Sequence, residues 1–158
     1  MRMNWRGVQA AVLAVCVGVA VCFQAVDAFA QNKGTVRGTE MSGYGRMILT
    51  LQDMPTVQTS VTSGVLIVTF QSPVSIDPEK LPSELPNYIG AARRDPDGKA
   101  LRFALGRNLR PHLKEAGERV FIDLLPDNWK GQPPGLPQDV VDELARRAYY
   151  KERIGSSP

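Results

Sequence analysis

The chain has 158 residues, a formal net charge of +3 at neutral pH and one histidine. This length suffices for one ordinary domain, and a net charge so near neutral argues against a general nucleic-acid binder or a polycation that coats membranes. Both cysteines, Cys16 and Cys22, lie in the first 30 residues, so the rest of the chain has no disulfide, thiol nucleophile or zinc–thiolate site. We therefore expect neither a metal nor a cofactor.

Residues 1–30 have the composition of a signal peptide. Two arginines precede an apolar run over residues 8–23, and two small residues stand where signal peptidase reads the chain, Ala28 and Ala30. We predict cleavage before Gln31, which removes two arginines and one aspartate and leaves a net charge of +2. An uncleaved anchor is the competing interpretation, but the run is short for a bilayer span of about 20 residues. The exported protein is expected in the periplasm or outside the cell, with membrane contact only through this peptide before cleavage.

The first predicted strands follow a polar segment. Residues 31–42 contain almost no apolar side chain, so we expect a flexible lead. Three strands are then predicted to form an antiparallel meander, at residues 44–51, 57–62 and 64–70. The third has the sequence GVLIVTF, in which apolar residues occupy both faces of an extended chain. This pattern suits the central strand of a sheet that is covered on both sides.

Residues 71–88 contain four prolines, which cannot lie in a central strand because proline lacks the hydrogen-bond donor of the ladder. We therefore expect a crossover, with Ile76, Leu81 and Leu85 buried beneath its edge. Four more strands are predicted beyond it, at residues 88–94, 101–105, 109–113 and 120–125, and the first two are joined by a turn at residues 95–98.

Alternating apolar residues recur in four segments, at residues 47–51, 66–70, 101–105 and 120–124. The two segments of each pair start 19 residues apart, and an offset of 54 residues relates the pairs. The chain therefore looks like two degenerate copies of one β unit. About seven short strands with turns at this spacing favour a mainly-β fold, a small antiparallel β-sandwich or a half-open barrel, over residues 43–126.

The chain changes character after residue 126. We expect a proline-rich strap at residues 127–136, an amphipathic helix at residues 137–153 and a disordered tail at residues 154–158. Acidic residues lie early in the helix and basic residues late, which agrees with the helix dipole. Its apolar face consists of Val140, Val141, Leu144, Ala145 and Ala148, and its expected ion pairs are Asp142–Arg146 and Glu143–Arg147. The helix either packs on the sandwich or begins a further domain.

Few groups beyond residue 30 are suited to acid–base or nucleophilic chemistry. His112 stands beside a proline with no carboxylate at motif spacing, and we interpret it as a surface residue. Asp123 falls on the polar side of an otherwise apolar strand; a buried arginine partner is conceivable, but a solvent-facing carboxylate is favoured. Catalysis by paired carboxylates is the minor alternative, and we expect that the protein is not an enzyme.

The charge distribution is uneven between residues 93 and 114. Seven basic residues stand there against Asp95 and Asp97, which gives this segment a net charge of +5. The candidate ligand-binding residues are five of these arginines and one tryptophan of the strap, namely Arg93, Arg94, Arg102, Arg107, Arg110 and Trp129. Arginines on one sheet face would form forked hydrogen bonds to carboxylates or phosphates, although a solvated outer face is the favoured interpretation. The tryptophan is either a ligand platform or, as we favour, a plug at the end of the β-core.

Two segments, residues 64–73 (GVLIVTFQSP) and 118–126 (ERVFIDLLP), together with the repeated strand pattern and the leader, resemble the AMIN domain. The likeness covers residues 44–125 and implies a periplasmic β-sandwich of the kind attached to cell-wall amidases and to secretin-type pilus proteins. It also implies peptidoglycan binding and no catalytic residues. The section from residues 123–131 through residues 144–147 looks like the N-terminal region of large exported proteins that continue into tetratricopeptide repeats.

These observations predict a non-catalytic periplasmic targeting or binding module. It would dock an envelope protein on the cell-wall polymer or on an anionic envelope partner, and it would bind no nucleic acid. The alternative is a protein–protein adaptor that acts through the helix at residues 137–153, as the N-terminal part of a longer tetratricopeptide-repeat protein.

Overall fold

The computed structural model describes residues 32–155. The predicted signal peptide with its cleavage residues Ala28, Ala30 and Gln31 lies outside this range, as do residues 156–158 of the predicted tail. No helix between residues 32 and 155 has both the length and the hydrophobicity needed to pass through a membrane.

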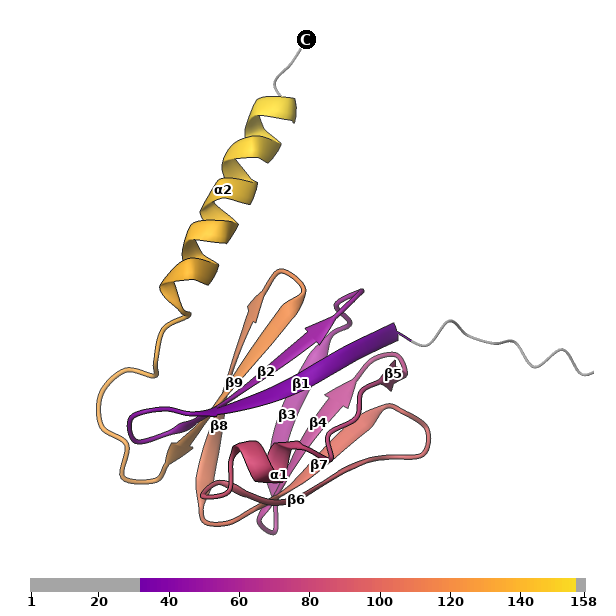
Figure 1. Ribbon diagram of the computed structural model, residues 1–158, viewed down its shortest axis with the longest axis vertical. Coiled ribbons are helices and arrows are strands. Elements are labelled where there is room, and N and C mark those ends of the chain that lie inside the picture. The colour runs from indigo at the N-terminus through magenta and orange to yellow at the C-terminus, as the bar shows by residue number, and fades with distance from the viewer. Residues whose placement is uncertain (1–31, 156–158) are drawn as a thin grey trace, which may run out of the picture.

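Nine strands of the described chain form two sheets that make a sandwich (Figure 1). One sheet has the order β5-β1-β2-β9-β8 and the other the order β3-β4-β7-β6, and all pairs are antiparallel except β1–β5. The strands are β1 (Asn32–Glu40), β2 (Gly45–Leu51), β3 (Val57–Thr62), β4 (Val65–Phe70), β5 (Val74–Ser75), β6 (Ile89–Arg94), β7 (Ala100–Leu105), β8 (Leu109–Ala116) and β9 (Arg119–Pro126). The helices are α1 (Leu81–Glu84) and α2 (Gln138–Gly155). The prediction of a small mainly-β sandwich with a C-terminal helix is confirmed, with two more strands than expected.

The core lies between the two sheets because the strands alternate apolar and polar residues. Met47 and Leu49 of β2, Leu66 and Val68 of β4, and Phe103 of β7 are all completely buried in it. Each side chain of this size stabilises the fold by about 1.5–3 kcal/mol when it is removed from water. The apolar alternation seen in the sequence is therefore the main source of stability.

The predicted flexible lead at residues 31–42 is wrong, because β1 occupies most of it. This strand pairs with β2 from Gly34 opposite Leu51 to Glu40 opposite Gly45. Its inner face carries glycines on either side of Val36, so the strand shows no hydrophobic alternation in the sequence. A Cβ atom at Gly34 would lie 2.6 Å from the carbonyl oxygen of Thr50, which shows how closely the backbones approach there.

The predicted meander over residues 44–70 is also wrong. β2 pairs with β1 and β9, whereas β3 pairs with β4 in the other sheet. The connection at residues 52–56 passes from one sheet to the other, and its Met54 packs on the core. The chain changes sheets again between β7 and β8, so neither half forms a continuous meander.

The strand at residues 64–70 is central, as predicted, but it is not covered on both sides. β4 lies between β3 and β7, with Leu66, Val68 and Phe70 buried and with Val65 and Ile67 half-buried on the outer face. The strand that is buried on both faces is instead β9, in which residues 120–125 are all buried. The reason is that the strap and α2 cover the outer face of the five-stranded sheet only.

The crossover at residues 71–88 has the predicted buried residues. Ile76, Leu81 and Leu85 are at most 1% exposed. The crossover also contains the short strand β5 and the single-turn helix α1, which packs against both β1 and β6 and so closes one edge of the sandwich (Figure 1). This places the crossover beside the edge strand β6.

Helix α2 packs on the sandwich only at its beginning. It is longer than predicted, since it includes Ile154 and Gly155 of the expected tail. Val140 is buried against Phe121 and Ala116, and Leu144 is partly buried in the same cluster. Every residue from 145 to 155 is exposed, and the helix projects away from the sheets (Figure 1).

Candidate functional site

The candidate arginines do not form one site. Arg93 of β6 and Arg102 of β7 lie directly opposite each other on the outer face of the four-stranded sheet. Arg94 follows on the other side of the same strand, where its Nη1 lies 3.5 Å from the Oγ of Ser75. The guanidinium of Arg107 lies 4.7 Å from the centre of the Tyr88 ring. The candidate arginines that lie close together are therefore Arg93 and Arg94 of β6 and Arg102 of β7.

Arg110 and Trp129 belong to the other side of the molecule. Arg110 is on β8, with its Nε 4.0 Å from Asp127. Trp129 is half-buried and packs edge-to-face on Tyr44 at 5.5 Å between ring centres. Its Nε1 donates to the backbone oxygen of Gln132 at 3.3 Å. The tryptophan therefore braces the strap on the outer face and is not part of the core between the sheets. Its interpretation as a ligand platform or as a plug at the end of the β-core stays a prediction.

The charge of Arg102 is already balanced. Its Nε and Nη2 donate to the carboxylate of Asp95, each at 2.8 Å, in a forked pair. The hydrogen bond from Arg102 lowers the pKa of Asp95. Arg93 forms no salt bridge among residues 32–155 and is exposed. Of the two arginines on this face, Arg93 is thus the one available to an external anion.

Two depressions adjoin the edge strand β6, and both are lined by Ala92 and Arg93. The larger, which we call the edge groove, has a volume of about 580 Å³ and its charged or hydroxyl side chains are those of Ser75, Asp77, Glu79, Arg93 and Arg94. The smaller, which we call the face depression, has a volume of about 320 Å³ and is otherwise lined by Val65, Ala91, Arg102 and Ala104. The strand β6 therefore separates two neighbouring hollows that share one arginine.

Asp123 has the buried arginine partner that we considered less favoured from the sequence. The Nε of Arg46 lies 2.6 Å from its Oδ1 and the Nη2 lies 2.8 Å from its Oδ2, and the two residues are 4% and 1% exposed. The prediction of a solvent-facing carboxylate is wrong because the strap covers this part of β9. The Nη2 of Arg46 also donates to the backbone oxygen of Gly135 at 2.8 Å, and Lys114 donates to that of Pro134 at 2.5 Å.

His112 lies in the same row as this ion pair. It is directly opposite Asp123 in the pairing of β8 and β9, and it is half-buried rather than fully on the surface. Its Nδ1 is buried and has no hydrogen-bond partner within the described chain. No group of three histidine, cysteine or acidic residues between residues 32 and 155 is arranged to hold a metal ion.

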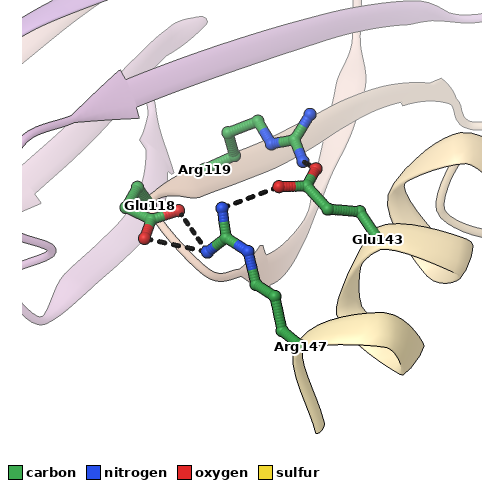
Figure 2. A network of polar contacts seen from close by, with 4 residues as sticks. All are labelled: Glu118, Arg119, Glu143 and Arg147. Atoms are coloured by element: carbon green, nitrogen blue, oxygen red, sulfur yellow. Dashed lines mark hydrogen bonds and ion pairs between the residues drawn. The ribbon is translucent and has the colours of Figure 1, made fainter. Parts of the chain in front are cut away.

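The beginning of α2 is held to the sandwich by a network of four charged residues (Figure 2). Arg147 donates to both carboxylate oxygens of Glu118 at 2.9 Å and to Glu143 at 2.7 Å, and Arg119 donates to the other oxygen of Glu143. The predicted Glu143–Arg147 pair is thus present, whereas Asp142 accepts a hydrogen bond from Gln138. The network joins the β8–β9 hairpin to the helix, a contact that spacing within the helix could not reveal.

A scan against protein-family models found no match, and a search of curated proteins found none either. The resemblance to the AMIN domain therefore stays a prediction.

Proposed function

We propose that the protein is a non-catalytic binding module of the cell envelope that docks on the cell-wall polymer, peptidoglycan, through the hollows around β6. The observation that carries this proposal is the sharing of Arg93 by the edge groove and the face depression. An extended ligand that crosses β6 would contact both hollows and pass over this arginine. Guanidinium groups bind carboxylates in a forked geometry, and carboxylates are the anionic groups of cell-wall peptides.

The arrangement of the sandwich supports this use of the four-stranded sheet. The strap and α2 cover the outer face of the five-stranded sheet, whereas Val65 and Ile67 on the outer face of β4 are only half-buried. The face depression lies on this uncovered face, beside small side chains, Ala91 and Ala104. Small residues leave room for a polymer to approach the backbone of β6 and β7.

The sequence of the leader supports the proposed location. Residues 1–30 have the features of an export signal, and no cysteine follows them. Binding of the wall by such a module would involve neither a cofactor nor nucleic acid. The proposal therefore joins the export signal to a surface that is suited to an anionic polymer.

The test is cosedimentation of the purified protein with isolated cell-wall sacculi. We expect binding that weakens as salt is raised and that is lost in Arg93→Glu. Arg110→Glu, an exposed arginine of the other sheet, is the matched control and should bind as the unaltered protein does. No cosedimentation at low salt, or equal loss in both variants, would refute wall binding at this surface.

A second candidate function is suggested by the exposed end of α2. Tyr149, Tyr150 and Ile154 are 54%, 62% and 77% exposed, on a part of the helix where every residue from 145 to 155 is exposed. In this alternative the module is a protein–protein adaptor at the N-terminal part of a longer tetratricopeptide-repeat protein. Truncation after Arg147 keeps the network of Figure 2 and should abolish capture of an envelope protein. Unchanged capture would exclude the adaptor.

A further inference from the structure

The edge groove carries charges of both signs on two different elements. The carboxylates of Asp77 and Glu79 come from the crossover, whereas the guanidinium groups of Arg93 and Arg94 come from β6. We propose that this groove binds a zwitterionic group, in which one ammonium and one carboxylate stand on the same short unit, as they do in an amino acid. The inference rests on the proposed function, because it names the part of a cell-wall peptide that the surface would recognise.

The opposite charges of the groove do not neutralise each other directly. No ion pair joins Asp77 or Glu79 to Arg93 or Arg94 within residues 32–155, and all four side chains are exposed. Arg94 makes only a long contact of 3.5 Å to the hydroxyl of Ser75. The carboxylate oxygens and guanidinium nitrogens of these residues are therefore more than 4 Å apart, and both signs of charge remain available to a ligand.

The two sides of the groove are held apart by the fold. Ile76 and Pro78 are buried, and the carboxylate of Asp77 accepts a hydrogen bond from the backbone amide of Glu79 at 3.0 Å. The amide of Val74 donates to the backbone oxygen of Gly98 at 2.9 Å, which joins the crossover to the β6–β7 turn. A site whose sides are already fixed loses less conformational entropy when a ligand binds.

This distribution of charge selects among ligands. A carboxylate would lie against Arg93 and Arg94, and an ammonium group would lie against Glu79 and Asp77. A group with only negative charge meets repulsion from the two carboxylates, and a group with only positive charge meets repulsion from the two arginines. The groove volume of about 580 Å³ is in the range of small-molecule sites, so it accommodates a residue of amino-acid size.

The test uses three N-acetylated tripeptides of the cell-wall sequence Ala–Glu–X, which differ only at the end of the third side chain. In the first, X is diaminopimelate and ends in an ammonium and a carboxylate; in the second, lysine supplies the ammonium alone; in the third, 2-aminopimelate supplies the carboxylate alone. Binding to the purified protein is followed by calorimetry and by shifts of backbone amide resonances. We expect the zwitterionic peptide to bind about 2- to 5-fold tighter than either analogue, as suits exposed charge pairs.

Two variants assign the contacts. Glu79→Gln should weaken binding of the zwitterionic peptide by a similar factor while the carboxylate-only peptide binds as before or tighter. Arg94→Gln should weaken the zwitterionic peptide and leave the lysine peptide unweakened. Glu115→Gln and Arg110→Gln, both exposed on β8, are the matched controls. Because all of these side chains are exposed, an unchanged unfolding midpoint would show that the variants remain folded.

The outcomes separate this inference from the proposed function. If sacculi bind but the three peptides bind equally, the inference is overturned and wall binding stands. If the diaminopimelate peptide binds in the groove tighter than both analogues while sacculi do not bind, the zwitterion site is supported and wall docking is refuted. Binding of the zwitterionic peptide that is insensitive to both Glu79→Gln and Arg94→Gln would overturn the assignment to this groove.

Discussion

Arg46 and Asp123 form a buried, forked ion pair across β2 and β9, directly opposite each other in the strand register. The hydrogen bond to Asp123 raises the pKa of Arg46, and the same guanidinium donates to Gly135 of the strap. It also lies 5.5 Å from the ring centre of Tyr44 and 5.7 Å from that of Phe121. One arginine thus connects the five-stranded sheet with the segment that covers it.

Removing the carboxylate should destabilise the fold strongly. In Asp123→Ala the guanidinium of Arg46 stays buried without a charge partner, which costs about 3–5 kcal/mol of the free energy of unfolding. Urea denaturation measures the loss. Asp95→Ala breaks a forked pair that is more exposed, and it should cause a much smaller change. Equal losses in the two variants would contradict a special role for the buried pair.

The strap should loosen when its aromatic contact is removed. Trp129→Leu deletes the edge-to-face contact with Tyr44 and should lower the free energy of unfolding by about 0.5–1.5 kcal/mol beyond the loss of apolar area. Trp129→Phe keeps a ring and should retain most of the stability. Trp129 is also the one tryptophan within residues 32–155, so its fluorescence should shift to longer wavelength if the strap opens before the sandwich unfolds.

β1 should not tolerate a side chain at Gly34. In Gly34→Ala the new Cβ atom would lie 2.6 Å from the Thr50 oxygen and 2.7 Å from Leu51, so the strand must shift. We expect a loss of about 1–3 kcal/mol in denaturation experiments. Gly90→Ala, where the nearest atom is 4.0 Å away, should change stability by less than about 0.5 kcal/mol. A neutral Gly34→Ala would argue against close packing of β1 on β2.

Docking of α2 on the sandwich should weaken at acid pH. The pKa of Glu118 is lowered by a hydrogen bond from the backbone amide of Glu118 itself and, to a smaller extent, by a hydrogen bond from Arg147. The pKa of Glu143 is lowered by a hydrogen bond from Arg119. A carboxyl group whose pKa is lowered on folding stabilises the folded state fully above its unfolded pKa of about 4.3, and this contribution is lost as the pH falls through the lower folded value. Protection of the amides at residues 140–148 from hydrogen exchange should therefore be constant from about pH 7 to 5 and decline at lower pH.

The Glu118→Gln, Glu143→Gln double variant is the control for this pH dependence. It lacks both carboxylates, so the acid-dependent component of the protection should disappear and protection should be lower throughout. An unaltered pH profile in the double variant would show that other groups govern the docking of the helix.

The interior strands could be read from the sequence because their signal is local. Leu66 and Val68 alternate with outward residues, and this pattern alone gives their burial. β1 gave no such signal, because two glycines replace inner apolar residues, and glycine in a strand is recognisable only once the neighbouring backbone is known. The assignment of each strand to a sheet could not be predicted either, because the alternation in β2 and β3 does not indicate which sheet each strand joins.

The candidate site was predictable only in part. The sequence identified Arg93 and Arg94 as members of a basic segment, but neighbouring residues of one strand point to opposite faces, so charge counting could not show that both line the edge groove. Asp77 and Glu79 were missed because the crossover was interpreted only by its prolines and its buried apolar residues. Likewise, the partner of Asp123 lies 77 residues away, which no local spacing could indicate.

The attachment of α2 also determines how the molecule would respond to tension. The helix follows β9 through the strap, and β9 is hydrogen-bonded to β2 on one side and β8 on the other. A pull on the helix would first load the exposed pair of Arg147 with Glu118 and the half-buried pair of Arg119 with Glu143, which are weaker than the ladder behind them. The helix and the strap would therefore detach first, as a compliant segment, while the hydrogen-bonded strands of the two sheets stay in place.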